Sequence, residues 1–161
     1  MRCALRLWLA LLLALCAASA SAQTLPKPGP KDLCPVCGML VSKYPNWAAT
    51  VVWKDGHAHH LDGAKDMFKF LLDLPAYAPG HQREQIAAIG VTDFYNLAKI
   101  DAREAWYVTG SDVLGPMGHE LVPLASGADA EEFLKDHKGK RILRFEDVTT
   151  KVLAQLDSGK F

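Results

Sequence analysis

Two cysteines in a short segment are the residues of this sequence best suited to chemistry. Cys34 and Cys37 lie in the run CPVCGM, which ends at Met39. A thiolate can act as a nucleophile, form a disulfide or bind a metal ion, and two cysteines separated by two residues occur in all three kinds of site. The spacing leaves four interpretations: a local disulfide, a thiol oxidoreductase, half of a zinc site, or a site for Cu(I).

The first two interpretations use the redox chemistry of the thiols. An exported chain meets an oxidising environment, but a disulfide that closes so short a loop constrains the unfolded chain little. The reactive cysteine of a thiol oxidoreductase sits at the N-terminus of a helix, where the helix dipole lowers its pKa. Gly38 and Pro45 disfavour a long helix after Cys37. An oxidoreductase acting through Cys34 and Cys37 stays as the alternative from a different functional class.

A zinc site would need histidines to complete it. Two thiolates and two imidazoles satisfy tetrahedral zinc, and His57, His59 and His60 follow the cysteines. Because alternate residues of a strand point to opposite faces, His57 and His59 share one face and His60 takes the other. All three therefore cannot converge on one ion without distortion.

Methionines favour the copper interpretation. In an extended chain residues two apart point to one side, so Cys37 and Met39 would present a thiolate and a thioether together. Soft sulfur donors of this kind select Cu(I). Met117, between a proline and a glycine, is the candidate for a third donor because an exposed loop is an unusual place for a core methionine. Met67 lies at core spacing on an expected helix and is interpreted as packing.

These motifs resemble those of a known family. The run CGM at Cys37 and the run PMGHELVP from Pro116 to Pro123, behind an export signal, are similar to the NosL family of exported copper proteins that accompany nitrous oxide reductase. The resemblance covers the chain from about Cys34 to Leu124. It implies a chaperone that binds one Cu(I) and delivers it to nitrous oxide reductase, through a membrane ABC-type maturation complex.

The resemblance also implies which residues hold the metal. Cys37, Met39 and Met117 match the positions expected to supply sulfur donors. Cys34 is an additional cysteine, which could be a fourth donor or a redox partner that switches binding off. His119, two residues beyond Met117, is the best placed of the histidines.

No motif of a hydrolytic or phosphate-binding enzyme accompanies these residues. The sequence contains neither a GxSxG nucleophile motif nor a glycine-rich phosphate loop. Glu120 and Asp62 are expected on the solvated surface. The sequence therefore predicts a metal-delivery protein that is not an enzyme.

The N-terminus predicts export. Arg2 and Arg6 precede an apolar run of 12 residues at 7–18, and small residues at 20–22 suit a cleavage site. Such a run is too short to span a bilayer core of ~30 Å. We expect a signal peptide at 1–22 and a periplasmic mature protein.

A lipid anchor is the alternative at this end of the chain. Cys16 could be a lipidated N-terminus, but Leu15 stands where that signal expects a small residue. Lipidation is therefore the less favoured hypothesis, and membrane association is expected only through a partner or through Cys16. Residues 23–31 are rich in proline and predict a flexible leader.

The composition limits the class of partner. The 161 residues carry 18 Lys and Arg against 18 Asp and Glu, with a pI near 7.0. Without a broad basic face to neutralise a phosphate backbone, nucleic acid is not an expected partner.

The residues around the motifs predict alternating strands and helices. Strands are indicated where β-branched and aromatic residues gather between turn signals, and helices where apolar residues recur every three or four positions. In the first half these are strands at 48–53, 57–61, 87–92 and 96–100, with a helix opened by Asp62-Gly63. In the second half they are strands at 105–109, 119–124 and 141–145, with helices at 129–138 and 148–156.

A hairpin followed by a helix thus occurs twice. A weak repeat supports this order, because Gly63-Ala64 and Gly127-Ala128, 64 residues apart, each precede an amphipathic helix. We expect an α+β fold of two small, similar ββαβ units that share one core, at 32–100 and 101–161. The resemblance implies the same pair of units.

Overall fold

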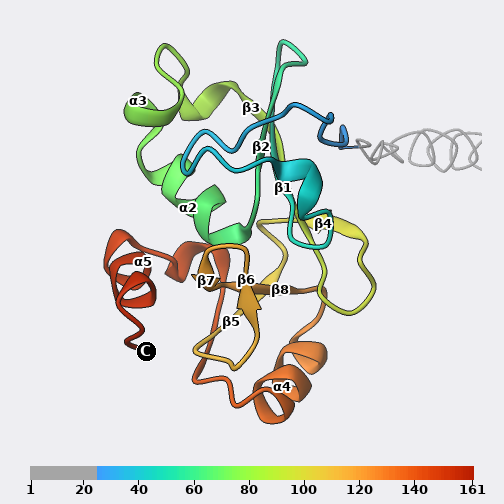
Figure 1. Cartoon of the computed structure of the whole chain (residues 1–161), viewed down its shortest axis with the longest axis vertical. Helices are drawn as coiled ribbons and strands as arrows, with labels where there is room; N and C mark the ends of the chain where they lie inside the picture. The colour runs from blue at the N-terminus through green and yellow to red at the C-terminus, as the bar shows by residue number, and fades with distance from the viewer. Residues whose placement is uncertain (1–24) are drawn as a thin grey trace, which may run out of the picture.

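The computed structural model describes residues 25–161, which form two larger antiparallel sheets, a small two-stranded ribbon and helices packed around them (Figure 1). The predicted signal peptide and Cys16 lie outside the described residues. No helix within residues 25–161 is long and apolar enough to cross a membrane.

The first sheet has the strand order β2-β1-β3-β4. β1 and β2 form a hairpin around the turn at Asp55-Gly56, as the sequence predicts, and β3 returns to pair with the other edge of β1. The helix α2 follows β2 directly. The bounds are Ala49–Trp53 for β1, Ala58–Leu61 for β2, Ala64–Leu72 for α2, Ile86–Thr92 for β3 and Lys99–Asp101 for β4.

The second sheet has the order β8-β5-β9 and repeats the connection of the first. β5 pairs with β8, the helix α4 follows, and β9 returns to the other edge of β5. The second hairpin differs by an insertion, a small ribbon of β6 and β7. The bounds are Trp106–Thr109 for β5, Leu114–Gly115 for β6, Gly118–His119 for β7, Val122–Leu124 for β8, Gly127–Asp136 for α4 and Arg141–Leu143 for β9.

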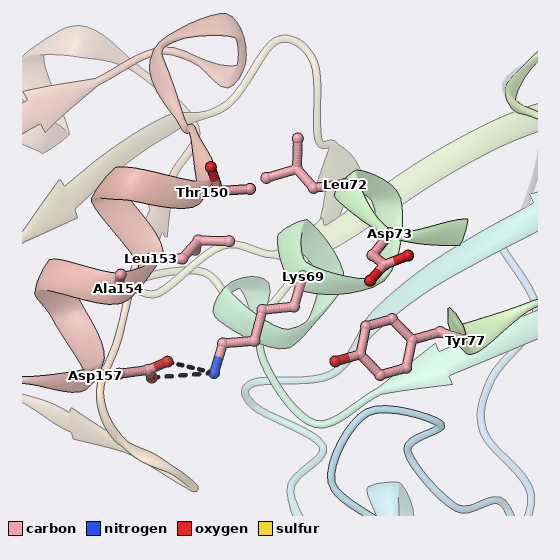
Figure 2. Close-up of a pocket in the computed structure, with 8 residues that line it drawn as sticks. All are labelled: Lys69, Leu72, Asp73, Tyr77, Thr150, Leu153, Ala154 and Asp157. Atoms are coloured by element: carbon pink, nitrogen blue, oxygen red, sulfur yellow. Dashed lines mark hydrogen bonds and ion pairs between the residues drawn. The ribbon is translucent and has the colours of Figure 1, made fainter. Parts of the chain in front are cut away.

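Short helices fill the connections. α5 at the C-terminus packs against α2, and Lys69 of α2 reaches across to Asp157 of α5 with Nζ to carboxylate distances of 2.8 and 3.0 Å (Figure 2). A groove of about 240 Å³ lies between the two helices beside this ion pair. The bounds are Val41–Lys43 for η1, Leu74–Tyr77 for α3, Arg83–Gln85 for η2, Phe145–Asp147 for η3 and Thr150–Asp157 for α5.

One large core joins the two sheets. Trp53 and Phe68 of the first half are buried in the same cluster as Tyr107 and Leu156 of the second. The rings of Phe68 and Tyr107 lie edge to face with centroids 5.1 Å apart. A smaller cluster lies under α4.

The α+β class expected from the sequence is confirmed. The ββαβ connection occurs in both halves, while an origin by duplication and the division at residue 100 stay predictions. Met67 is fully buried on α2, as its spacing indicates.

Candidate metal centre

The two cysteines lie in a tight loop held closed by backbone hydrogen bonds. The amide of Cys34 donates to the carbonyl of Met39, and the amide of Gly38 donates to the carbonyl of Cys34, both at 2.8 Å. Gly38 has a φ of +77°, in the left-handed region that favours glycine. The extended geometry assumed for Cys37 and Met39 is therefore wrong, because the left-handed residue between them turns the chain.

The loop brings both thiols against two carboxylates from the start of α2. Cys34 Sγ donates to Asp66 Oδ2 at 3.4 Å, and Cys37 Sγ donates to Asp62 Oδ1 at 3.5 Å. One ligand atom from each of these four residues lies within 4.8 Å of the other three. Both cysteines are unbridged. These four residues are called the thiol–carboxylate group below.

Asp62 does not lie on the surface, so the expectation of a solvated acid is wrong at this position. It is only 1% exposed, because it follows directly from the buried end of β2. Its second oxygen, Oδ2, is buried without a hydrogen-bond partner. A buried carboxylate oxygen in this state needs an added donor or cation to satisfy it, which fits a site that takes up a metal ion.

Burial controls the protonation of the thiols. Burial is the largest cause that raises the pKa of Cys37 to about 11, and the charge of Asp66 adds to it. Burial also raises the pKa of Cys34 and that of Asp66. The thiols are therefore protonated near neutral pH, unlike the activated cysteine of a thiol oxidoreductase. A metal ion that binds them must displace their protons.

The two thiols differ in access. Cys34 is 1% exposed, while Cys37 is half-buried and is the more accessible thiol. An ion that enters would meet Cys37 first and Cys34 second.

A carboxylate from the second half caps the helix that carries the group. Glu120 Oε1 accepts from the amide of Lys65 at 2.6 Å and from the amide of Leu121 at 2.9 Å. Glu120 is 3% exposed, so the expectation of a solvated surface acid is wrong. Its burial raises its pKa to about 8. A glutamate 55 residues away thus supplies the acceptor that the N-cap residue, Gly63, lacks.

Met117 lies in the turn of the β6–β7 ribbon and is 44% exposed. Its carbonyl accepts from Lys65 Nζ at 2.9 Å. This bond fastens the tip of the ribbon to Lys65 of α2, the residue that precedes Asp66 in the sequence. Met39, half-buried, closes the cysteine loop through its carbonyl.

Within residues 25–161, no histidine contributes a ligand atom to the thiol–carboxylate group. His119 packs its ring against Phe161, with centroids 4.9 Å apart, and its Nδ1 is buried without a partner. His60 contacts Thr50, 3.0 Å from Nδ1, and lies on the face of β2 opposite to His59.

The sequence gives no prediction for Asp66, and Asp62 is expected on the surface. Asp66 lies in the first turn of α2, but Asp62 precedes the extended N-cap residue Gly63, so helical spacing does not place the two carboxylates on one face. Their partnership with the cysteines depends on how the loop folds back onto α2, which spacing alone does not specify.

Comparison with known proteins identifies similar chains. The NosL family profile matches residues 27–153. The copper-binding lipoprotein NosL of Stutzerimonas stutzeri is 31% identical over 133 residues, which is 79% of this chain and 67% of that protein.

Two solved structures are also similar. The crystal structure of the copper chaperone NosL from Shewanella denitrificans superposes with a TM-score of 0.64 at 30% identity, over 78% of this chain and 96% of that one. The solution structure of apo-NosL from Achromobacter cycloclastes gives a TM-score of 0.41 at 27% identity, over 65% of this chain and 87% of that one.

Proposed function

The chain belongs to the NosL family, and from this premise we propose that it is an exported chaperone for Cu(I). Relatives are named as a copper-binding protein and as a copper chaperone. The observation that carries the proposal is the convergence of two thiols, one buried and one half-buried, in a single group of potential metal ligands.

The chemistry of the donors supports Cu(I) as the cargo. Two thiolates can hold a soft monovalent ion, and thioethers from Met39 and Met117 would complete a site of sulfur donors. Cys37, the more accessible of the two thiols, would be the position where a partner's sulfur ligand exchanges in. Asp62 and Asp66 would hold the two thiols in place before the metal arrives, since both accept from them.

We propose nitrous oxide reductase, or its membrane ABC-type maturation complex, as the recipient of the copper. Export to the periplasm belongs to the same proposal, and the relative from Stutzerimonas stutzeri is named a lipoprotein. The expectation that lipidation is the less favoured alternative is therefore not borne out, and Cys16 is retained as a candidate lipid attachment point.

An anaerobic titration of the reduced protein, lacking residues 1–22, with Cu(I) against a competing chelator tests the cargo. We expect one tightly bound Cu(I) per chain, lost in Cys37→Ser. Met117→Leu should weaken binding by about tenfold or more, while the control Met67→Leu, a change within the core, should leave the affinity unchanged. An unaltered affinity in Cys37→Ser would contradict the site, and firm binding of Zn²⁺ with weak binding of Cu(I) would contradict the cargo.

Transfer is tested separately. The Cu(I)-loaded protein is mixed with copper-free nitrous oxide reductase, alone and with the maturation complex, and copper in each protein is measured after separation. Copper that moves no faster than from a Cu(I)–chelator complex of equal affinity would contradict a delivery role, even if binding is tight.

A further inference from the structure

A second group of potential metal ligands lies away from the cysteines, at the far end of the first sheet. His57 immediately precedes β2, His59 lies within β2 two residues later, and His81 lies in the loop after α3. The β1–β2 turn and the loop after α3 both project away from the second half of the molecule (Figure 1). The three histidines are called the histidine triad below.

The triad is distinct from the thiol–carboxylate group. That group is built on the first residues of α2, whereas His59 packs on Phe70 toward the other end of the helix, with ring centroids 5.0 Å apart. Trp53, from β1, forms the floor beneath His59 and His81, at 5.8 and 4.2 Å between ring centroids.

The spacing of the three rings matches that of ligands to one metal ion. Their centroids are 4.8 Å apart for His57 and His59, 5.8 Å for His59 and His81, and 6.1 Å for His57 and His81. The centre of the triangle with these sides is about 3.3 Å from each centroid. An imidazole bound through nitrogen at about 2.0 Å places its ring centroid about 3.2 Å from the metal.

The ring nitrogens of the triad do not converge within 4.8 Å of one another as they stand, so binding requires the rings to turn. Rotation about the Cβ–Cγ bond of histidine is broad in energy, and it leaves the ring centroid nearly in place. His57 is exposed, so its ring has room to turn. We therefore propose that His57, His59 and His81 bind a divalent cation that prefers imidazole ligands, Cu²⁺ or Zn²⁺, at a site separate from the thiols.

One further feature favours a cation here. His81 Nδ1 is buried without a hydrogen-bond partner, which leaves a polar atom unsatisfied. A cation bound at this nitrogen would satisfy it.

The indole of Trp53 is tied to the same site. Its Nε1–H donates to His59 Nδ1 at 2.8 Å. A metal bound at Nδ1 replaces this bond, and one bound at Nε2 moves the proton of His59 to Nδ1, so either mode breaks it. The loss of about 1 kcal/mol for such a hydrogen bond is small beside the gain from a metal–nitrogen bond. Binding is therefore expected to change the fluorescence of Trp53.

The test uses a chain without thiols, Cys34→Ser with Cys37→Ser, titrated separately with Cu²⁺ and with Zn²⁺. We expect one ion per chain, quenching of Trp53 by Cu²⁺, and nitrogen hyperfine structure in the electron paramagnetic resonance spectrum of the Cu²⁺ form. His57→Ala and His81→Ala, made in that chain, should each weaken binding at least tenfold. His137→Ala is the matched control, because this histidine packs on Phe133 in the other half of the molecule.

Equal affinity in the parent, His57→Ala and His81→Ala would overturn the triad site, as would failure of both ions to bind. Competition between the ions decides which of the two is held. Should the chain without thiols fail to fold, wild-type protein loaded with one Cu(I) is titrated with Zn²⁺ while the imidazole signals are followed by NMR. Failure of the wild-type protein to bind Cu(I) would contradict the proposed chaperone function, but it would not bear on the metal site proposed at the histidine triad.

Discussion

Asp66 is the residue through which the reactivity of the thiols can be tuned. Its carboxylate accepts from Cys34 and its charge disfavours the thiolate of Cys37. The first cause of the raised Cys37 pKa is burial, so the charge accounts for only part of the shift. The protonation state of the thiols near neutral pH is thus set by burial and by Asp66, and not by the cysteine pair alone.

Replacing that charge should make Cys37 more reactive. In Asp66→Asn the pKa of Cys37 is expected to fall from about 11, and each unit of fall raises the thiolate fraction tenfold below the pKa. The rate at which iodoacetamide alkylates Cys37 between pH 8 and 10 measures this thiolate fraction. Asp136→Asn, an exposed position on α4, is the control, and equal rates in both variants would contradict the electrostatic role of Asp66.

His59 should make the fold sensitive to acid. Its pKa is about 4 in the folded chain against 6.5 ordinarily, so between these values the unfolded chain binds the additional proton. Stability is therefore retained above pH 6.5 and falls as the pH drops toward 4. Urea unfolding at pH 7 and pH 4.5 measures this, and His59→Phe should reduce the difference between the two midpoints. An undiminished difference would assign the acid sensitivity to other groups.

Residue types alone identified part of the candidate site. Cys34 and Cys37 were predicted as partners because their spacing is short. Their carboxylate partners were not, since Asp62 and Asp66 approach them only when the loop closes on α2. The roles of Met39, Met117 and His119 as ligands stay predictions. His81 carries no local signal, because it lies in the loop after α3, whereas the other two histidines of the triad lie in and beside β2.

At the scale of elements, the start of α2 depends on a close fit between two halves of the chain. A Cβ on Gly63 would overlap Glu120 Oε2, and one on Gly115 would lie 3.0 Å from Glu120 Cγ. The two glycines thus leave the space that the buried carboxylate fills. The absence of a side chain at Gly63 is required for the cap from Glu120.

A double-mutant cycle tests this fit. Gly63→Ala should reduce the free energy of unfolding by about 1 to 3 kcal/mol, the usual cost of overpacking. In a Glu120→Ala background the same change should cost little, because the overlapping carboxylate is gone. Urea unfolding of the four proteins gives the coupling energy, and a cost that is the same in both backgrounds would refute the steric explanation.

Strands and helices were predicted well where their hydrophobic pattern was strong. The hairpin of β1 and β2, the helix α2 and the strand β5 lie within one or two residues of expectation. The single strand expected at 119–124 is instead divided between β7 and β8, since Glu120 turns inward to cap α2. The short helix α3 was also missed because one turn of helix around Pro75 has no periodicity to detect.

The whole molecule is expected to unfold as a unit. Trp53 and Tyr107 belong to one buried cluster that spans both sheets, and α5 inserts Leu153 and Leu156 into it. Neither half can lose its packing without exposing apolar surface of the other.

Single-tryptophan variants can test this cooperativity. One variant keeps only Trp53, in the first sheet, and the other keeps only Trp106, in the second. In each variant, the urea midpoint measured by tryptophan fluorescence should equal the midpoint measured by circular dichroism. A fluorescence transition that precedes the circular dichroism transition in either variant would show that the halves unfold separately.

The ribbon of β6 and β7 is a place where the second hairpin can be redesigned without changing the core. The first hairpin closes with a short turn, whereas the second carries an insertion whose tip holds Met117 outside the core. A substitution at such a tip leaves the buried cluster unchanged. A set of variants confined to this tip would therefore be the direct way to alter the donor atom that the proposed copper site draws from the ribbon, and with it the selectivity among metal ions, on an unchanged scaffold.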